Sequence, residues 1–78
     1  MEPRVLSYRV VLRPEPEGGY TVLVPSLPGL VTFGDTIEEA KAMALDAIEA
    51  YLKSLEKHGE ELKDDSDTWE SLLTVRHA

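Results

Sequence analysis

The chain has 78 residues, 15 acidic against 8 basic side chains, a formal net charge of -7 and no cysteine. This length predicts one domain, residues 1–78, with a small core, because such a chain buries only about 60% of its unfolded surface. The missing cysteines exclude a disulfide framework and a thiolate zinc site. The first residues lack the basic and then apolar layout of a signal peptide, and no apolar run approaches the roughly 20 residues that span a bilayer. We therefore expect a cytoplasmic protein with no membrane partner.

The net negative charge of the chain comes entirely from its second half. Residues 1–34 hold three arginines and three glutamates, whereas residues 35–78 hold twelve acidic side chains and five basic ones. Such a surface repels phosphate backbones and attracts basic partners, so we expect no direct binding of nucleic acid. The simpler alternative is that the acidic side chains only keep a small domain soluble.

Two strands joined by a loop are predicted first. Arg4–Arg13 alternates between an apolar face and a face with two arginines, which is typical of a strand. The prolines and glycines of residues 14–19 predict a hairpin with a longer loop. Tyr20–Val24 is rich in β-branched and aromatic residues and predicts a second strand, which should end at Pro25 because proline cannot donate a ladder hydrogen bond.

A tight turn and a third strand follow. Pro28-Gly29 has the residue order of a type II turn, with a fixed φ followed by a positive φ. Leu30–Phe33 is the predicted third strand. Short connections between the three strands predict an antiparallel meander.

One long amphipathic helix is expected next. Thr36 with Glu39 fits a capping box, and Asp35 is the competing N-cap. The apolar residues recur at spacings of three and four, which predicts a single buried stripe: Ile37, Ala40, Ala44, Ala47, Ile48, Tyr51 and Leu55. Gly59 suits the position after the C-cap, so the helix should span about 20 residues.

The tail is predicted to return to the sheet. Glu60–Asp67 is an acidic loop, and Leu72–Arg76 is expected to form a short fourth strand. Trp69 is expected to pack the tail onto the core. The predicted fold class is therefore α+β, with a three-stranded antiparallel meander, one long helix packed on the sheet and a short fourth strand.

No motif of the chain predicts covalent or metal chemistry. An EF-hand loop that begins at Asp64 would need glycine where Trp69 stands, so this loop does not fit. A two-metal nuclease needs carboxylates that converge from strands, and the predicted strands contain none. His58 suits the negative end of the helix dipole, and His77 lies next to the C-terminus. We expect a protein that is not an enzyme and needs no metal or cofactor.

Several motifs together resemble the HicB-like antitoxin family. They are Gly19-Tyr20, the element Pro25-x-Leu27-Pro28-Gly29, and the element Gly34-Asp35-Thr36-x-Glu38-Glu39-Ala40. The resemblance extends over about residues 8–50 and implies a partial RNase H-like fold without nuclease activity. It also implies a partner, a small basic HicA-type toxin that cleaves mRNA. The chain resembles a short form of the family without a DNA-binding domain.

We therefore expect an antitoxin-like binding module that forms a homo-oligomer, because so small a core leaves sheet edges exposed. The alternative is a solitary acidic adaptor or small-ligand-binding domain on the same scaffold. A basic toxin should be attracted to the acidic helix end and tail, with a tryptophan as an apolar anchor. The residues of this predicted partner surface are Glu56, Glu60, Glu61, Asp64, Asp65, Asp67 and Trp69. The competing interpretation is that the tryptophan is buried and the acidic side chains are only solvated.

Overall fold

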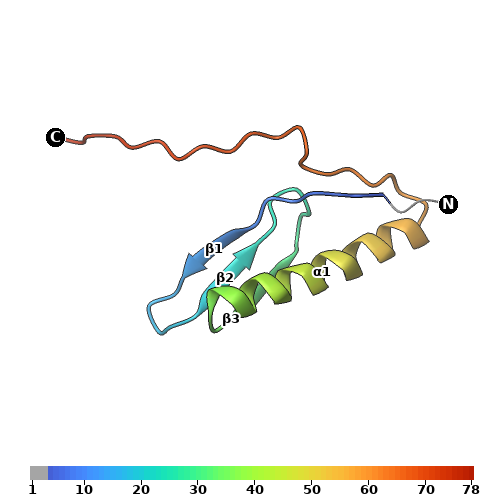
Figure 1. Cartoon of the computed structure of the whole chain (residues 1–78), viewed down its shortest axis with the longest axis horizontal. Helices are drawn as coiled ribbons and strands as arrows, with labels where there is room; N and C mark the ends of the chain where they lie inside the picture. The colour runs from blue at the N-terminus through green and yellow to red at the C-terminus, as the bar shows by residue number, and fades with distance from the viewer. Residues whose placement is uncertain (1–3) are drawn as a thin grey trace.

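A computed structural model of the chain describes residues 4–78, and its architecture is α+β. Three strands come first and one long helix follows: β1 (Val11–Pro14), β2 (Tyr20–Leu23), β3 (Val31–Gly34) and α1 (Ile37–Lys57). The strands form an antiparallel sheet in the order β1-β2-β3, and α1 lies along one face of it (Figure 1). The predicted meander with one packed helix is confirmed. Within residues 4–78, no helix has the length and apolar character to cross a bilayer.

The connections between strands follow the predicted turn chemistry. The loop between β1 and β2 closes through the Glu15 amide, which donates to the Gly19 carbonyl at 3.0 Å. The turn before β3 closes through the Leu30 amide, which donates to the Leu27 carbonyl at 3.1 Å. Gly29 has a φ of 84° in this turn, as the third residue of a type II turn requires.

Both ends of α1 are capped as the sequence predicts. The Thr36 side chain accepts a hydrogen bond from the Glu39 amide at 3.0 Å, so Thr36 rather than Asp35 is the N-cap. At the other end the Gly59 amide donates to the Glu56 carbonyl, and the Glu60 amide donates to the Leu55 carbonyl. Gly59 has a φ of 70°. This pair of bonds is a Schellman motif, which satisfies the last helix carbonyls.

The core lies between the sheet and α1 and forms two neighbouring clusters. The first cluster contains Val24, Leu27, Leu30 and Ile48. The second contains Val22, which is fully buried, with Ala40 and Ala44 of α1. The small alanines let the helix approach the sheet closely. The approach is closest at Gly34, where an added Cβ would lie 2.4 Å from backbone atoms of Ala40.

The predicted first strand is too long. Arg4–Arg13 was expected to pair throughout, but the ladder with β2 begins only at Val11. The physical reason is that β2 ends at Leu23, two residues before Pro25, so residues 4–10 have no strand beside them to complete a ladder. They are extended all the same, and Tyr8 and Val10 pack against the core.

The predicted fourth strand does not form, and the predicted burial of two apolar side chains, Trp69 and Ile37, is wrong. Leu72–Arg76 is extended without a ladder partner, and Figure 1 shows the tail running out beyond the sheet. Trp69 is 94% exposed, so it does not pack the tail onto the core. Phe33 is 45% exposed because it lies on the sheet face opposite α1. Ile37, which was predicted in the buried stripe of the helix, is 47% exposed.

Candidate partner-binding surface

After α1, residues 62–68 run beside residues 4–9, and the tail beyond them extends away from the sheet. In Figure 1 the segment that follows α1 passes beside the extended residues before β1. The Asp65 amide donates to the Ser7 carbonyl at 2.8 Å, and the Ser7 amide donates to Asp64 Oδ2 at 2.8 Å. These contacts, with those of Arg9 and Ser26 described next, form what we call the tail latch.

Asp65 is the central residue of the tail latch. Its side chain is only 5% exposed, and it is the buried charged residue of the described chain. Oδ2 accepts from the Arg9 amide at 2.9 Å, and Oδ1 accepts from the Ser26 hydroxyl. The carboxylate therefore joins three segments: the residues before β1, the loop after β2 and the tail.

Hydrogen bonds keep both latch carboxylates ionised. The Arg9 amide first, and then the Ser26 hydroxyl, lower the pKa of Asp65 against the opposing effect of burial. The Ser7 amide first, and then Ser66, lower the pKa of Asp64. Both groups are therefore anionic wherever the domain is folded at neutral pH.

Further contacts extend the tail latch on either side. The Arg9 side chain donates from Nε to the Thr68 carbonyl at 2.9 Å, which holds the tail just before Trp69. The Tyr8 hydroxyl donates to the Lys63 carbonyl, and its pKa is raised, mainly by burial. In the tail latch, one backbone bond and several bonds from side chains thus stand where a sheet ladder would otherwise continue.

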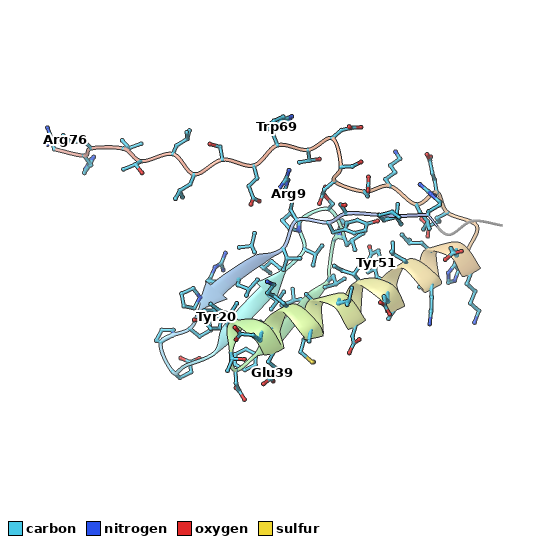
Figure 2. All side chains as sticks on the ribbon, viewed as in Figure 1. Arg9, Tyr20, Glu39, Tyr51, Trp69 and Arg76 are labelled. Atoms are coloured by element: carbon cyan, nitrogen blue, oxygen red, sulfur yellow. The ribbon has the colours of Figure 1, made fainter. Side chains whose placement is uncertain are left out.

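The seven residues of the predicted partner surface divide into two groups. Asp64 and Asp65 have partners within the chain, so Asp65 cannot contact another protein while the tail latch is closed. The other five are exposed to solvent: Glu56, Glu60, Glu61, Asp67 and Trp69. Figure 2 shows Trp69 on the outgoing tail, directed away from the helix.

The tail latch was missed by the sequence analysis. The acidic residues of this loop were expected either to face a basic partner or to be solvated, because a run of acidic residues usually lies on the surface. The available signal was the placement of hydrogen-bonding residues at Ser7, Arg9 and Ser26 in segments otherwise expected to be strand and turn. Pairing of distant segments through side chains has no periodic pattern, so sequence reasoning did not predict it.

His58 has the capping role that was expected of it. Its Nδ1 lies 2.7 Å from the Ser54 carbonyl in the last turn of α1. Among residues 4–78 there is no group of three histidine or carboxylate side chains arranged to hold a metal ion.

Known proteins share this sequence pattern. A family model described as "HicB_like antitoxin of bacterial toxin-antitoxin system" matches residues 8–75. The UPF0150 protein Ta0767 of Thermoplasma acidophilum is 41% identical over 61 residues, which are 78% of this chain and 88% of the relative. No solved structure matches the chain.

Two similar proteins carry the antitoxin name and are much longer. Antitoxin HicB 1 of Photorhabdus laumondii is 48% identical over 56 residues, 67% of this chain and 36% of the relative. Antitoxin HicB of Escherichia coli strain K12 is 44% identical over 43 residues, 55% of this chain and 31% of the relative. The chain thus matches about a third of the length of each of these two antitoxins.

Proposed function

Because the chain belongs to the HicB-like antitoxin family, matched over residues 8–75, we propose that it is a non-enzymatic cytoplasmic antitoxin. Its proposed partner is a small, basic, HicA-type toxin that cleaves mRNA, as the family resemblance implies. The single observation that carries the proposal is the extent of the family match, which includes the sheet, the helix and most of the tail. The acidic charge of the second half supports a basic partner.

The proposed partner surface is the exposed part of the acidic helix end and tail. Glu56, Glu60 and Glu61 lie at the C-terminal end of α1 and just after it, and all three are exposed. Asp67 and Trp69 follow on the outer side of the tail latch and are exposed as well. Charges around an interface mainly steer association, whereas a desolvated tryptophan contributes most to its free energy.

The test of function starts from the neighbouring reading frame. The proposal predicts that it encodes a short, basic, histidine-containing protein. Expression of that neighbour alone should arrest growth, and co-expression of this chain should restore it. Growth arrest without rescue, although both proteins accumulate, would contradict the proposal.

The proposed surface has its own test, a comparison of two triple charge reversals. The first variant carries Glu56→Lys, Glu60→Lys and Glu61→Lys at the helix end. The control carries Glu17→Lys, Asp35→Lys and Asp46→Lys, three exposed positions outside the proposed surface. Both variants have the same net charge, so a difference between them isolates the location of the charge.

We expect the first variant to bind the toxin more slowly, by about tenfold or more at low salt, and the control to bind nearly as fast as the natural chain. Stopped-flow association rates at several salt concentrations provide the measurement. Equal slowing in both variants would show that only net charge matters. An unchanged rate in the first variant would place the interface elsewhere, while the antitoxin function could still hold.

The alternative function is a solitary adaptor or small-ligand-binding domain. The observation that favours it is an apolar groove of about 280 Å³ between β1 and α1. A reading-frame neighbour without basic character, together with no complex at micromolar concentration, would favour this alternative.

A further inference from the structure

The tail after the latch carries several large apolar side chains and has no partner among residues 4–68. Large apolar side chains are almost fully exposed there: Trp69 at 94%, Leu72 at 94%, Leu73 at 82% and Val75 at 80%. No hydrogen bond joins residues 69–78 to the rest of the described chain. Exposure of so many large apolar side chains to water is unfavourable, and their burial against an apolar surface would be favourable.

An apolar groove lies on the helix side of the sheet edge. One part, of about 280 Å³, is lined by Val10, Leu12, Lys41, Ala44, Leu45 and Ile48. A second part, of about 320 Å³, shares Leu45 and Ile48 and continues along Leu6 and Tyr8 to Arg4. The two parts together follow the N-terminal segment and β1 on one side and α1 on the other.

The groove is open because no strand lies on the outer side of β1. The strand order is β1-β2-β3, so β1 is an edge, and α1 makes its sheet contacts with β3 and β2. The helix-facing side chains of β1 are therefore covered on one side only, and Leu45 of α1 remains 58% exposed. An added strand beside β1 would cover the groove and pair a free edge.

The tail has the pattern that such a strand needs. Leu73 and Val75 alternate on one face and could enter the groove, while Leu72 and Thr74 on the other face would continue the sheet surface beside Val11. The segment is rich in β-forming residues. The face of β1 that lines the groove is apolar, with Val10 just before the strand and Leu12 within it.

We propose that residues 69–76 of one copy dock as a fourth strand on the β1 edge and groove of a second copy, and that the exchange is reciprocal. The tail latch supports a second copy as the occupant. It fixes residues 64–68 beside residues 7–9, and beyond it the tail runs outward instead of turning back to its own β1 (Figure 1). This inference goes beyond toxin binding and does not depend on it.

Charge complementarity gives the docked strand a direction. Lys41 lies at the β1 end of the groove and Glu49 at the opposite end, near Arg4. In the tail, Glu70 comes before the apolar residues and Arg76 after them. Glu70 near Lys41 and Arg76 near Glu49 place the tail antiparallel to β1 of the second copy. Within a single chain the latched tail runs parallel to the N-terminal segment instead, as the sequential contacts from Arg4 to Arg9 with Leu62 to Thr68 show.

The first test measures molecular mass in solution with two matched surface variants. Leu45→Asp places a charge in the groove, and Met43→Asp places one on an exposed apolar residue of the same helix outside it. We expect light scattering to give twice the chain mass of 8.7 kDa for the natural chain and for Met43→Asp. Leu45→Asp and Leu73→Asp should give the monomer mass, with an unchanged circular dichroism spectrum.

A second test distinguishes exchange between copies from closure within one chain. The chain has no natural cysteine, so Leu45→Cys in one preparation and Val75→Cys in another can be mixed and oxidised. The proposal predicts a cross-linked pair of the two different chains, with much less product when Met43→Cys replaces Leu45→Cys. A natural chain that stays monomeric at high micromolar concentration, or a dimer that persists in Leu45→Asp and Leu73→Asp, would overturn the proposal.

Discussion

At the scale of single residues, Asp65 is the most consequential side chain of the tail. It is buried, and it accepts hydrogen bonds from the Arg9 amide and the Ser26 hydroxyl. Burial of an ionised group is tolerated only where hydrogen bonds replace its water, as they do here. The same carboxylate therefore fixes the start of the tail and the segment that leads into β1.

The substitution Asp65→Asn tests this role. Asparagine keeps the shape but turns an amide group toward one of the two donors, so we expect a loss of about 1–3 kcal/mol in the free energy of unfolding. Asp67→Asn, at an exposed position two residues later, should change it by less than about 0.5 kcal/mol. Urea unfolding gives both values, and similar effects of the two substitutions would contradict the role of Asp65.

The tail latch should also depend on pH. Hydrogen bonds lower the pKa of Asp64 and of Asp65 in the folded chain. A carboxyl group with a lowered pKa contributes its full stabilisation above its unfolded pKa of about 3.9 and loses it as the pH falls through the folded value. We therefore expect the tail latch to stay closed from about pH 5 to pH 8, to weaken below about pH 4, and to open only as the pH falls below the lowered pKa values of the folded chain.

The measurement is the difference in unfolding free energy between the natural chain and Asp65→Asn. This difference should be constant near neutral pH and should shrink in acid, because protonation removes the carboxylate from the natural chain as well. The protection of the Arg9 amide against hydrogen exchange, relative to the unfolded chain at the same pH, should fall over the same range. A difference that does not change between about pH 7 and pH 3 would show that the charge of Asp65 is irrelevant to the latch.

At the scale of elements, local signals determined what could be predicted. The N-cap Thr36, the turn glycine Gly29 and the helix end at Gly59 were all predicted, because each depends on neighbours within a few residues. The extent of the first strand and the fate of the tail depend on which distant segments lie beside them. No periodicity encodes that choice, so both predictions failed there.

The contact between β3 and α1 makes a prediction at Gly34. A Cβ there would lie 2.4 Å from the nitrogen and Cα of Ala40, which are backbone atoms and cannot rotate away. We expect Gly34→Ala to destabilise the fold by about 1–3 kcal/mol through overpacking. The double variant with Ala40→Gly should not recover this loss, because the backbone clash remains. Recovery in thermal unfolding would show that the Ala40 side chain is the obstacle instead.

At the scale of the whole molecule, the chain carries a formal charge of -7, which disfavours the approach of other acidic molecules. Of the predicted partner surface, the sequence identified five exposed residues, but it could not separate them from Asp64 and Asp65, which bond within the chain. The distinction depends on the path of the tail past Ser7 and Arg9. Acidic residues that are neighbours in the sequence can therefore have different surroundings in the folded chain.

This charge predicts that the chain alone does not bind DNA. Phosphate contacts need basic side chains, whose counterion release makes binding steeply dependent on salt. We expect no change in the fluorescence polarisation of a labelled duplex from its own promoter at micromolar chain concentration and low salt. A polarisation increase that disappears as salt rises would contradict this expectation.

The most direct measurement for the central claim is toxin activity in vitro. The purified product of the neighbouring reading frame is incubated with a labelled mRNA, and this chain is added in increasing amounts. The antitoxin account predicts that RNA cleavage ceases at a stoichiometric ratio and that the two proteins elute as one complex. Cleavage that continues at full rate with a several-fold excess of folded chain, and no complex at micromolar concentration, would contradict it.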